Sequence, residues 1–189
     1  MVSNPQFIIH VGPMFAAKTS ALLMSLERCK YQNKVIAAFK PKIDDRYADE
    51  EIVSHNGFRH VALGISSGAD IIKYLSDPES RTPEVIAVDE AFMIPEIADT
   101  LIWLYRNGFT VIVSSLDISA TGKVFPEIQK MLPWATKIEK CTAVCTICGA
   151  DAHYTHRKLS GGEEIEIGGA ETYEPRCLTH HVGIDLRAL

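Results

Sequence analysis

The residues from Gly12 to Thr19, which read G-P-M-F-A-A-K-T, have the spacing of a phosphate-binding loop. In the pattern G-x-x-x-x-G-K-[ST], backbone N–H groups wrap the phosphates, the lysine reaches the outer phosphates, and the hydroxyl binds Mg²⁺. Lys18 and Thr19 fit this pattern, whereas Ala17 stands where the second glycine is usual. If that position requires a positive φ, alanine there costs roughly 1 kcal/mol or more. The alternative interpretation is an ordinary strand–turn–helix that carries Lys-Thr by chance.

Two adjacent carboxylates, Asp89 and Glu90, follow the apolar segment 84–88. Proteins with alternating strands and helices place their ligands at strand ends of this kind, and an acidic residue there assists Mg²⁺ in phosphate-loop enzymes. Glu90 is also a candidate general base for a substrate hydroxyl. A solvated acidic turn before a helix is the alternative. Together with the loop, the pair favours a nucleotide-dependent kinase.

Four metal-binding side chains form two short pairs near the C-terminal end. Cys145 and Cys148 have C-x₂-C spacing, and Cys177 and His180 have C-x₂-H spacing. Two such pairs can surround one Zn²⁺ tetrahedrally, and four protein ligands leave no open position, so we expect a structural zinc site. His181 is an alternative fourth ligand, although the spacing favours His180. A redox C-x-x-C is a competing interpretation, but the βαβ pattern of such proteins does not surround Cys145.

The remaining cysteines and histidines have no ligand or triad spacing that indicates a site. We expect Cys29 to lie in the core and Cys141 to pack near the metal pair. Ordinary surface or core roles are expected for the other histidines, which are His10, His55, His60, His153 and His156.

Composition narrows the class of protein. The chain has 189 residues, of which 47% are hydrophobic, and a net charge of −5. This acidic balance argues against a nucleic-acid partner, and no apolar run approaches the roughly 18 residues of a membrane span. The N-terminus lacks the pattern of a signal peptide, so we expect a cytoplasmic protein with reduced cysteines.

The elements that would position these residues alternate along the first two thirds of the chain. Apolar runs predict strands at 7–11, 34–39, 84–88 and 109–113. Amphipathic spacing predicts a helix at 18–30, one that contains Ile71 and ends near Pro78, and one with Pro95 in its first turn. We therefore expect an α/β fold, with a P-loop-type, mostly parallel sheet flanked by helices.

The composition and the hydrophobic pattern of the sequence change after about residue 140, where cysteines cluster and helical periodicity is lost. We expect a nucleotide-binding α/β domain at 1–140 and a small, zinc-ribbon-like lobe at 141–189.

Several segments between Phe7 and about His180 resemble motifs of the type II thymidine kinases and follow one another in the same order. Besides the loop, they are Lys40-Pro41 with Asp44-Asp45-Arg46-Tyr47, Val88-Asp89-Glu90-Ala91, Leu116-Asp117, Ala143-Val144-Cys145 with Cys148, Tyr154-Thr155-His156-Arg157, and Ile167-Gly168-Gly169-Ala170 with Tyr173 and Cys177.

The resemblance implies ATP- and Mg²⁺-dependent phosphorylation of the 5′-hydroxyl of thymidine or deoxyuridine, in pyrimidine deoxynucleoside salvage for DNA synthesis. It implies Glu90 as the catalytic base. The implied ATP- and phosphate-binding residues are Gly12, Pro13, Met14, Phe15, Ala16, Ala17, Lys18, Thr19, Asp44, Asp45, Arg46, Asp89, Glu90, Ala91 and Phe92. The implied nucleoside-binding residues, which include a lasso-like loop, are Met14, Thr155, Glu164, Ile165, Glu166, Ile167, Gly168 and Tyr173.

The resemblance also implies a homotetramer that thymidine triphosphate inhibits. This chain departs from the family at Met93 and Ala120, where the family usually has aromatic residues, and at Ala17. Two alternatives follow from these departures: a phosphate-loop enzyme with altered base selectivity or another acceptor, and a catalytically weak nucleotide-binding relative.

Overall fold

The computed structural model describes residues 4–43, 50–54, 56–78, 82–158 and 168–181. Its centre is a six-stranded sheet with the order β5-β2-β6-β7-β1-β8, and every neighbouring pair in it is parallel. The six strands are β1 (Phe7–Val11), β2 (Ile36–Pro41), β5 (Leu63–Ile65), β6 (Val85–Val88), β7 (Thr110–Ser115) and β8 (Lys137–Lys140). The expected α/β fold with a mostly parallel sheet is confirmed.

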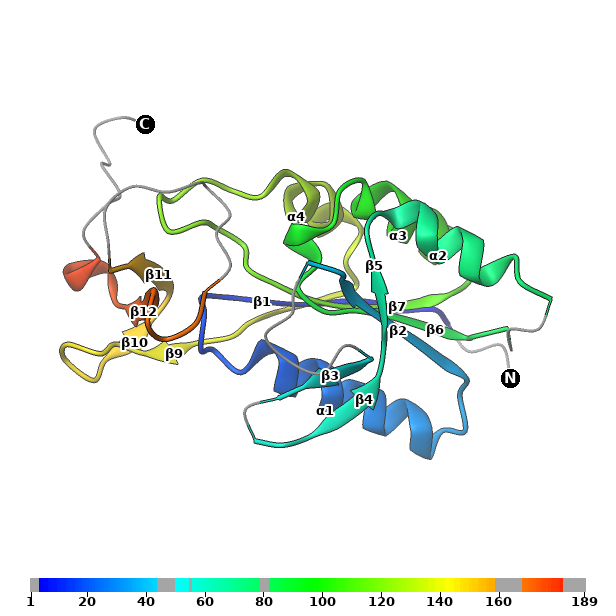
Figure 1. Cartoon of the computed structure of the whole chain (residues 1–189), viewed down its shortest axis with the longest axis horizontal. Helices are drawn as coiled ribbons and strands as arrows, with labels where there is room; N and C mark the ends of the chain where they lie inside the picture. The colour runs from blue at the N-terminus through cyan, green and yellow to red at the C-terminus, as the bar shows by residue number, and fades with distance from the viewer. Residues whose placement is uncertain (1–3, 44–49, 55, 79–81, 159–167, 182–189) are drawn as a thin grey trace.

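Helices cover both faces of this sheet (Figure 1). One face packs against α1 (Lys18–Tyr31), whose Leu22 and Leu26 are fully buried. The other face carries three helices, α2 (Gly68–Leu75), α3 (Ile97–Arg106) and α4 (Pro126–Met131). Because side chains alternate along a strand, Phe7, Ile9 and Val11 of β1 face the three helices, and Ile8 packs on the α1 side.

The predicted elements agree with the observed ones to within a few residues, with one correction at Pro95. The sequence placed Pro95 in the first turn of a helix, whereas α3 begins at Ile97 and Pro95 lies in the preceding turn. There the carbonyl oxygen of Pro95 accepts a hydrogen bond from Gly68 N at 3.3 Å, at the start of α2. The proline therefore fixes the junction of two helices instead of opening one.

Smaller pairs of strands flank the sheet. The hairpin of β3 (Glu51–Val53) and β4 (Arg59–Val61) lies near α1, against which it packs Ile52. Beyond β8, two antiparallel pairs lie close to the C-terminal end of β1 (Figure 1). They are β9 (Ala143–Val144) with β10 (Asp151–Ala152), and β11 (Tyr154–Arg157) with β12 (Tyr173–Arg176).

Short 3₁₀ turns complete the described elements, at η1 (Ala91–Met93), η2 (Leu132–Trp134) and η3 (Leu178–His180). In the described part of the chain, no helix has the length and apolar character needed to cross a membrane. The division into domains at 140/141 stays a prediction, although β8, the last strand of the main sheet, ends at Lys140.

Candidate active site and metal centre

The phosphate loop, Gly12–Thr19, connects the end of β1 to the start of α1. Gly12 has a φ of 150°, and a Cβ there would lie 2.3 Å from the carbonyl oxygen of Cys141, so only glycine fits. Phe15 and Ala17 have φ values of 65° and 55°, in the left-handed region. The position of the missing glycine therefore does require a positive φ, and Ala17 adopts it at an energetic cost.

The C-terminal strands hold this loop in place. Ala16 is buried in a small cluster with Ala143, Cys145 and Ala152, where only small side chains allow the loop to approach so closely. The backbone N–H of Met14 donates a hydrogen bond of 3.0 Å to Oγ1 of Thr155, which is 2% exposed. The loop conformation thus depends on residues more than 120 positions later in the chain.

Lys18 is buried at the base of the loop, and its Nζ donates a hydrogen bond of 2.6 Å to the carbonyl oxygen of Pro13. Burial lowers the pKa of Lys18, and the nearby carboxylates of Glu90 and Asp89 oppose this shift. A buried cation at the first turn of a helix, beside several backbone N–H groups, makes the loop a binding site for anions.

Asp89 lies at the end of β6 and contacts both the loop and β7. Thr19 Oγ1 donates to its two carboxylate oxygens at 3.3 and 3.2 Å, and Ser114 Oγ donates a short hydrogen bond to Oδ1. Desolvation raises the pKa of Asp89 to about 7, with repulsion from Glu90 added and the two hydroxyl donors acting in the opposite direction. A buried carboxylate beside a hydroxyl is a ligand set of the kind Mg²⁺ uses in phosphate-loop enzymes.

Glu90 has a left-handed φ of 50°, an unusual conformation for a glutamate that directs the chain from β6 into η1. It lines a cleft together with Lys18, Thr19 and Asp89. Strained residues of this kind are often found at functional sites, where the surrounding structure supports the strain.

The cleft brings together most of the predicted phosphate-binding residues. Among those of the sequence prediction it contains Met14, Phe15, Ala16, Ala17, Lys18, Thr19, Asp89 and Glu90. Gly12 and Pro13 are buried and do not line it. Ala91 and Phe92 lie in the core instead, where the ring of Phe92 packs at 4.7 Å from that of Phe125.

The sequence prediction missed several residues of the cleft. Lys40, at the end of β2, and the β3 segment 51–53 line it, and Ser114 supports it through Asp89. Lys40 belongs to a segment that resembles the family, so the sequence did contain a signal from which it could have been predicted as a site residue. Neither Ser114 nor β3 carries a recognisable motif, because their positions follow from sheet pairing.

The structure describes only some of the residues that were predicted to bind the nucleoside. Thr155 contacts the loop, and Gly169 and Ala170 line the cleft. Tyr173 lies in β12, buried, where its hydroxyl accepts a hydrogen bond of 3.2 Å from Arg157. Gly168 precedes these residues and is partly buried. The predicted residues that lie outside the described ranges are Asp44, Asp45, Arg46, Glu164, Ile165, Glu166 and Ile167.

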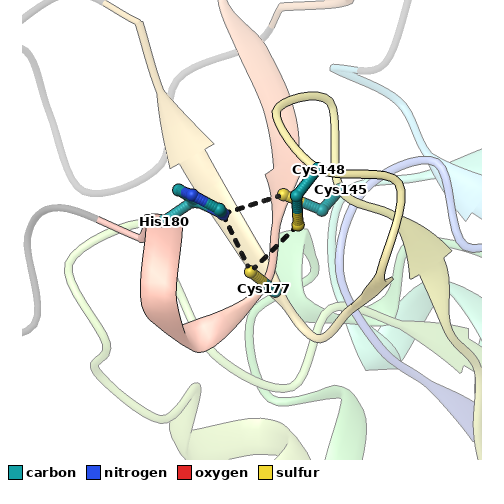
Figure 2. Close-up of side chains that lie close together, drawn as sticks. All are labelled: Cys145, Cys148, Cys177 and His180. Carbon is teal, nitrogen blue, oxygen red and sulfur yellow. Dashed lines mark hydrogen bonds between the residues drawn. The ribbon is translucent and has the colours of Figure 1, made fainter.

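The four predicted metal ligands converge on one point (Figure 2). Cys177 Sγ lies 3.2 Å from His180 Nδ1 and 3.7 Å from Cys148 Sγ, and Cys145 Sγ lies 3.9 Å from the same nitrogen. Ligand atoms around a tetrahedral Zn²⁺ are about 3.5–3.8 Å apart, as zinc–sulfur and zinc–nitrogen bond lengths require. The residues present therefore fit a zinc ion without rearrangement of the backbone.

Electrostatics and the neighbouring histidine support this assignment of ligands. Desolvation would raise the pKa of Cys145, but backbone N–H donors of Cys177, Ile147 and Cys148 outweigh it and lower the pKa to about 6, which favours the thiolate. His181 points elsewhere, since its Nε2 lies 3.0 Å from the carbonyl oxygen of Thr155. His180 is thus the histidine that belongs to the cluster.

A parallel sheet, a glycine-opened loop between β1 and α1, and an acidic pair at the end of β6 together define the class of P-loop-type nucleotide-binding α/β proteins. Within this class, the profile of the family described as "Thymidine kinase" matches residues 5–181. A thymidine kinase of Thermococcus kodakarensis is 38% identical over 181 residues, which cover 90% of this chain and 91% of that protein.

The chain therefore belongs to the thymidine kinase family, and is a phosphotransferase of nucleoside salvage that acts on thymidine. Among solved structures, the genome packaging NTPase B204 from Sulfolobus turreted icosahedral virus 2, in complex with sulfate, has a TM-score of 0.46 at 15% identity and covers 76% of each chain.

Proposed function

We propose that this protein transfers the γ-phosphoryl group of ATP, with Mg²⁺, to the 5′-hydroxyl of thymidine and of deoxyuridine. The observation that carries the proposal is the cleft in which Lys18, Thr19, Asp89 and Glu90 meet. Phosphoryl transfer needs positioning and charge stabilisation more than covalent assistance, and this set of side chains supplies both.

Each of these side chains has a separate role in the proposal. Lys18 exchanges its hydrogen bond to Pro13 for the outer phosphates of the donor. Thr19 and Asp89, already in contact with each other, hold Mg²⁺, which neutralises phosphate charge when bound. Glu90 accepts the proton of the substrate hydroxyl as the general base. The raised pKa of Asp89 fits an acidic residue that becomes fully charged only beside a cation.

The same proposal assigns the nucleoside to the opposite wall of the cleft. In this proposal Met14 and Thr155, which share a hydrogen bond, contact the nucleobase. The segment 164–168, with Tyr173, is proposed as the lasso-like loop that closes over the nucleoside. Gly169 and Ala170 support this placement because they line the cleft immediately after that loop. Closure excludes water, which limits hydrolysis of ATP.

We propose a structural role for Zn²⁺ at Cys145, Cys148, Cys177 and His180. Cys145 packs in the same small cluster as Ala16 of the phosphate loop, and β12, which precedes Cys177, pairs with the strand that contains Thr155. An ion at this point would fix both segments to each other, and thereby fix the lobe against the loop.

We also propose a cytoplasmic homotetramer that thymidine triphosphate inhibits. The tetramer follows the family resemblance, and exposed apolar side chains that an interface could bury are Met24 and Tyr31 of α1, at 68% and 82%, and Trp103 of α3, at 53%. Light scattering of the purified chain tests the tetramer, and a single-chain mass would contradict it.

One assay tests the reaction. The purified chain receives Mg-ATP with thymidine, deoxyuridine, deoxycytidine or deoxyguanosine in turn, and the monophosphates formed are quantified. We expect turnover with thymidine and deoxyuridine. The variant Glu90→Gln should lose turnover while it retains ATP binding, measured by calorimetry. Glu84→Gln is the matched control, since Glu84 is exposed and immediately precedes β6, at the end of the strand opposite Glu90.

The outcomes separate the parts of the proposal. If only deoxycytidine or deoxyguanosine were phosphorylated, the proposed selectivity for thymidine and deoxyuridine would be refuted, but the kinase reaction itself would stand. Turnover in Glu90→Gln equal to that of Glu84→Gln would refute the general base.

A further inference from the structure

A second group of possible metal ligands lies beneath the phosphate loop, apart from the zinc cluster. It consists of His10 on β1, Glu139 on β8, and Cys141 just after β8. The ligand atoms of these three side chains all lie within 4.8 Å of one another. The kinase reaction uses none of the three.

The hydrogen bonds of His10 show which ring nitrogen carries the proton. Ser25 Oγ donates its only proton to the carbonyl oxygen of Ala21, at 3.0 Å. While Ser25 donates to Ala21, its oxygen can only accept from His10 Nε2, which lies 3.2 Å away, and in that arrangement Nε2 carries the hydrogen. In the neutral ring, Nδ1 then has an unprotonated lone pair. Metal-binding histidines commonly have this arrangement, in which the second nitrogen donates to a fixed oxygen.

The free lone pair of His10 points at a negative group. Nδ1 lies 3.3 Å from Oε2 of Glu139, in contact with the carboxylate but without a well-aligned hydrogen bond, and the side chain is only 2% exposed. Burial lowers the pKa of His10, and the carboxylate of Glu139 acts in the opposite direction. A cation bound by both this nitrogen and this oxygen would satisfy the two groups together.

Cys141 completes a set of three different donor types. Imidazole, thiolate and carboxylate together suit Zn²⁺ and similar divalent transition metals rather than Mg²⁺ or Ca²⁺. Glu139 is 44% exposed, which leaves a path from solvent and a position for a water as fourth ligand. Lys137, now 3.1 Å from Oε2 of Glu139, would give up this ion pair to the metal.

We propose that His10 Nδ1, the Glu139 carboxylate and Cys141 Sγ form a second site for a divalent transition metal ion such as Zn²⁺. Binding forms three metal–ligand bonds and releases the thiol proton of Cys141 to the solvent.

Such an ion would hold the start of the phosphate loop in a fixed position. Cys141 N donates to the carbonyl oxygen of Val11 at 2.7 Å, and the carbonyl oxygen of Cys141 lies against Gly12. Because His10 stands two residues before Gly12, the three ligands would tie β1 to the end of β8 at the point where the loop begins. Occupancy should therefore raise the thermal midpoint of the protein.

The test uses the full chain as purified, with its resident metal left in place and no chelator. Co²⁺ is added in steps, and the thiolate-to-cobalt charge-transfer band is followed in the near ultraviolet. Total cobalt and zinc are measured after desalting, and the thermal midpoint is recorded in parallel. We expect about one Co²⁺ per chain, without loss of zinc, together with the band and a higher midpoint.

Two variants and a matched control test the ligands Cys141 and Glu139. Cys141→Ala should lose the band, and Glu139→Gln should weaken cobalt binding on the order of tenfold or more. Glu139 is at the surface, so this variant should fold. Glu27→Gln is the matched control, because Glu27 is similarly exposed and also pairs with a lysine at 3.1 Å. Binding unchanged in Glu139→Gln, a band that persists in Cys141→Ala, or uptake only by exchange with zinc would each overturn the proposal.

Discussion

Ala17 offers a sharp test of the energetics of the phosphate loop, because it is an alanine in a left-handed conformation. Its φ of 55° costs an L-residue roughly 1–2 kcal/mol, which glycine does not pay. Glycine in turn gains about 0.4–1 kcal/mol of conformational entropy in the unfolded chain. The methyl group of Ala17 is exposed, so little burial is lost. Ala17→Gly should therefore stabilise the protein by about 0.5–1 kcal/mol.

The neighbouring alanine is the matched control. Ala16 is only 4% exposed and is not among the residues with positive φ. Ala16→Gly loses a buried methyl worth about 0.8 kcal/mol and adds the same unfolded-state entropy, so it should destabilise by about 1–2 kcal/mol. The same Ala→Gly substitution at two adjacent positions should thus change the free energy of unfolding in opposite directions.

Urea and thermal denaturation measure the difference. For a chain of this length, 1 kcal/mol shifts the thermal midpoint by about 2–4 °C, so Ala17→Gly should raise it by roughly 1–4 °C. Ala17→Val should lower it, because a β-branched side chain is poorly accommodated at positive φ. A loss of stability in Ala17→Gly as large as that in Ala16→Gly would refute the reasoning.

Three further predictions concern the lobe and the acidic pair. Thr155→Val leaves the N–H of Met14 without its acceptor and should cost about 1–3 kcal/mol in urea denaturation, whereas Thr155→Ser should cost much less; equal costs would contradict this. Because the pKa of Asp89 is raised to about 7, its contribution to stability falls as pH rises from about 4 through 7. In the absence of nucleotide, the thermal midpoint of Asp89→Asn minus that of the wild type should therefore be larger at pH 8 than at pH 5. The same difference at both pH values would contradict this prediction. Cys148→Ser should lower the zinc content by about one ion per chain and lower the thermal midpoint, and unchanged zinc by metal analysis would exclude Cys148 as a ligand.

Local patterns in the sequence were enough for much of the fold and part of the site. The apolar runs predicted β1, β2, β6 and β7 because buried parallel strands need apolar residues on both faces. The C-x₂-C and C-x₂-H pairs predicted a cluster of four possible metal ligands, which the structure brings together, because each pair is held by a short turn. Pro95 was misplaced because a proline tolerated in a helix's first turn is equally tolerated in the turn that precedes it.

The loop from Gly12 to Thr19 was visible from its spacing alone, and its chemistry follows from residue types that a short segment contains. Only the tertiary structure decided what supports it. Thr19 meets Asp89 across 70 positions, Met14 meets Thr155 across 141, and His10 meets Glu139 on a neighbouring strand. These contacts depend on strand order and register, which the packing of the whole sheet sets and which no local pattern encodes.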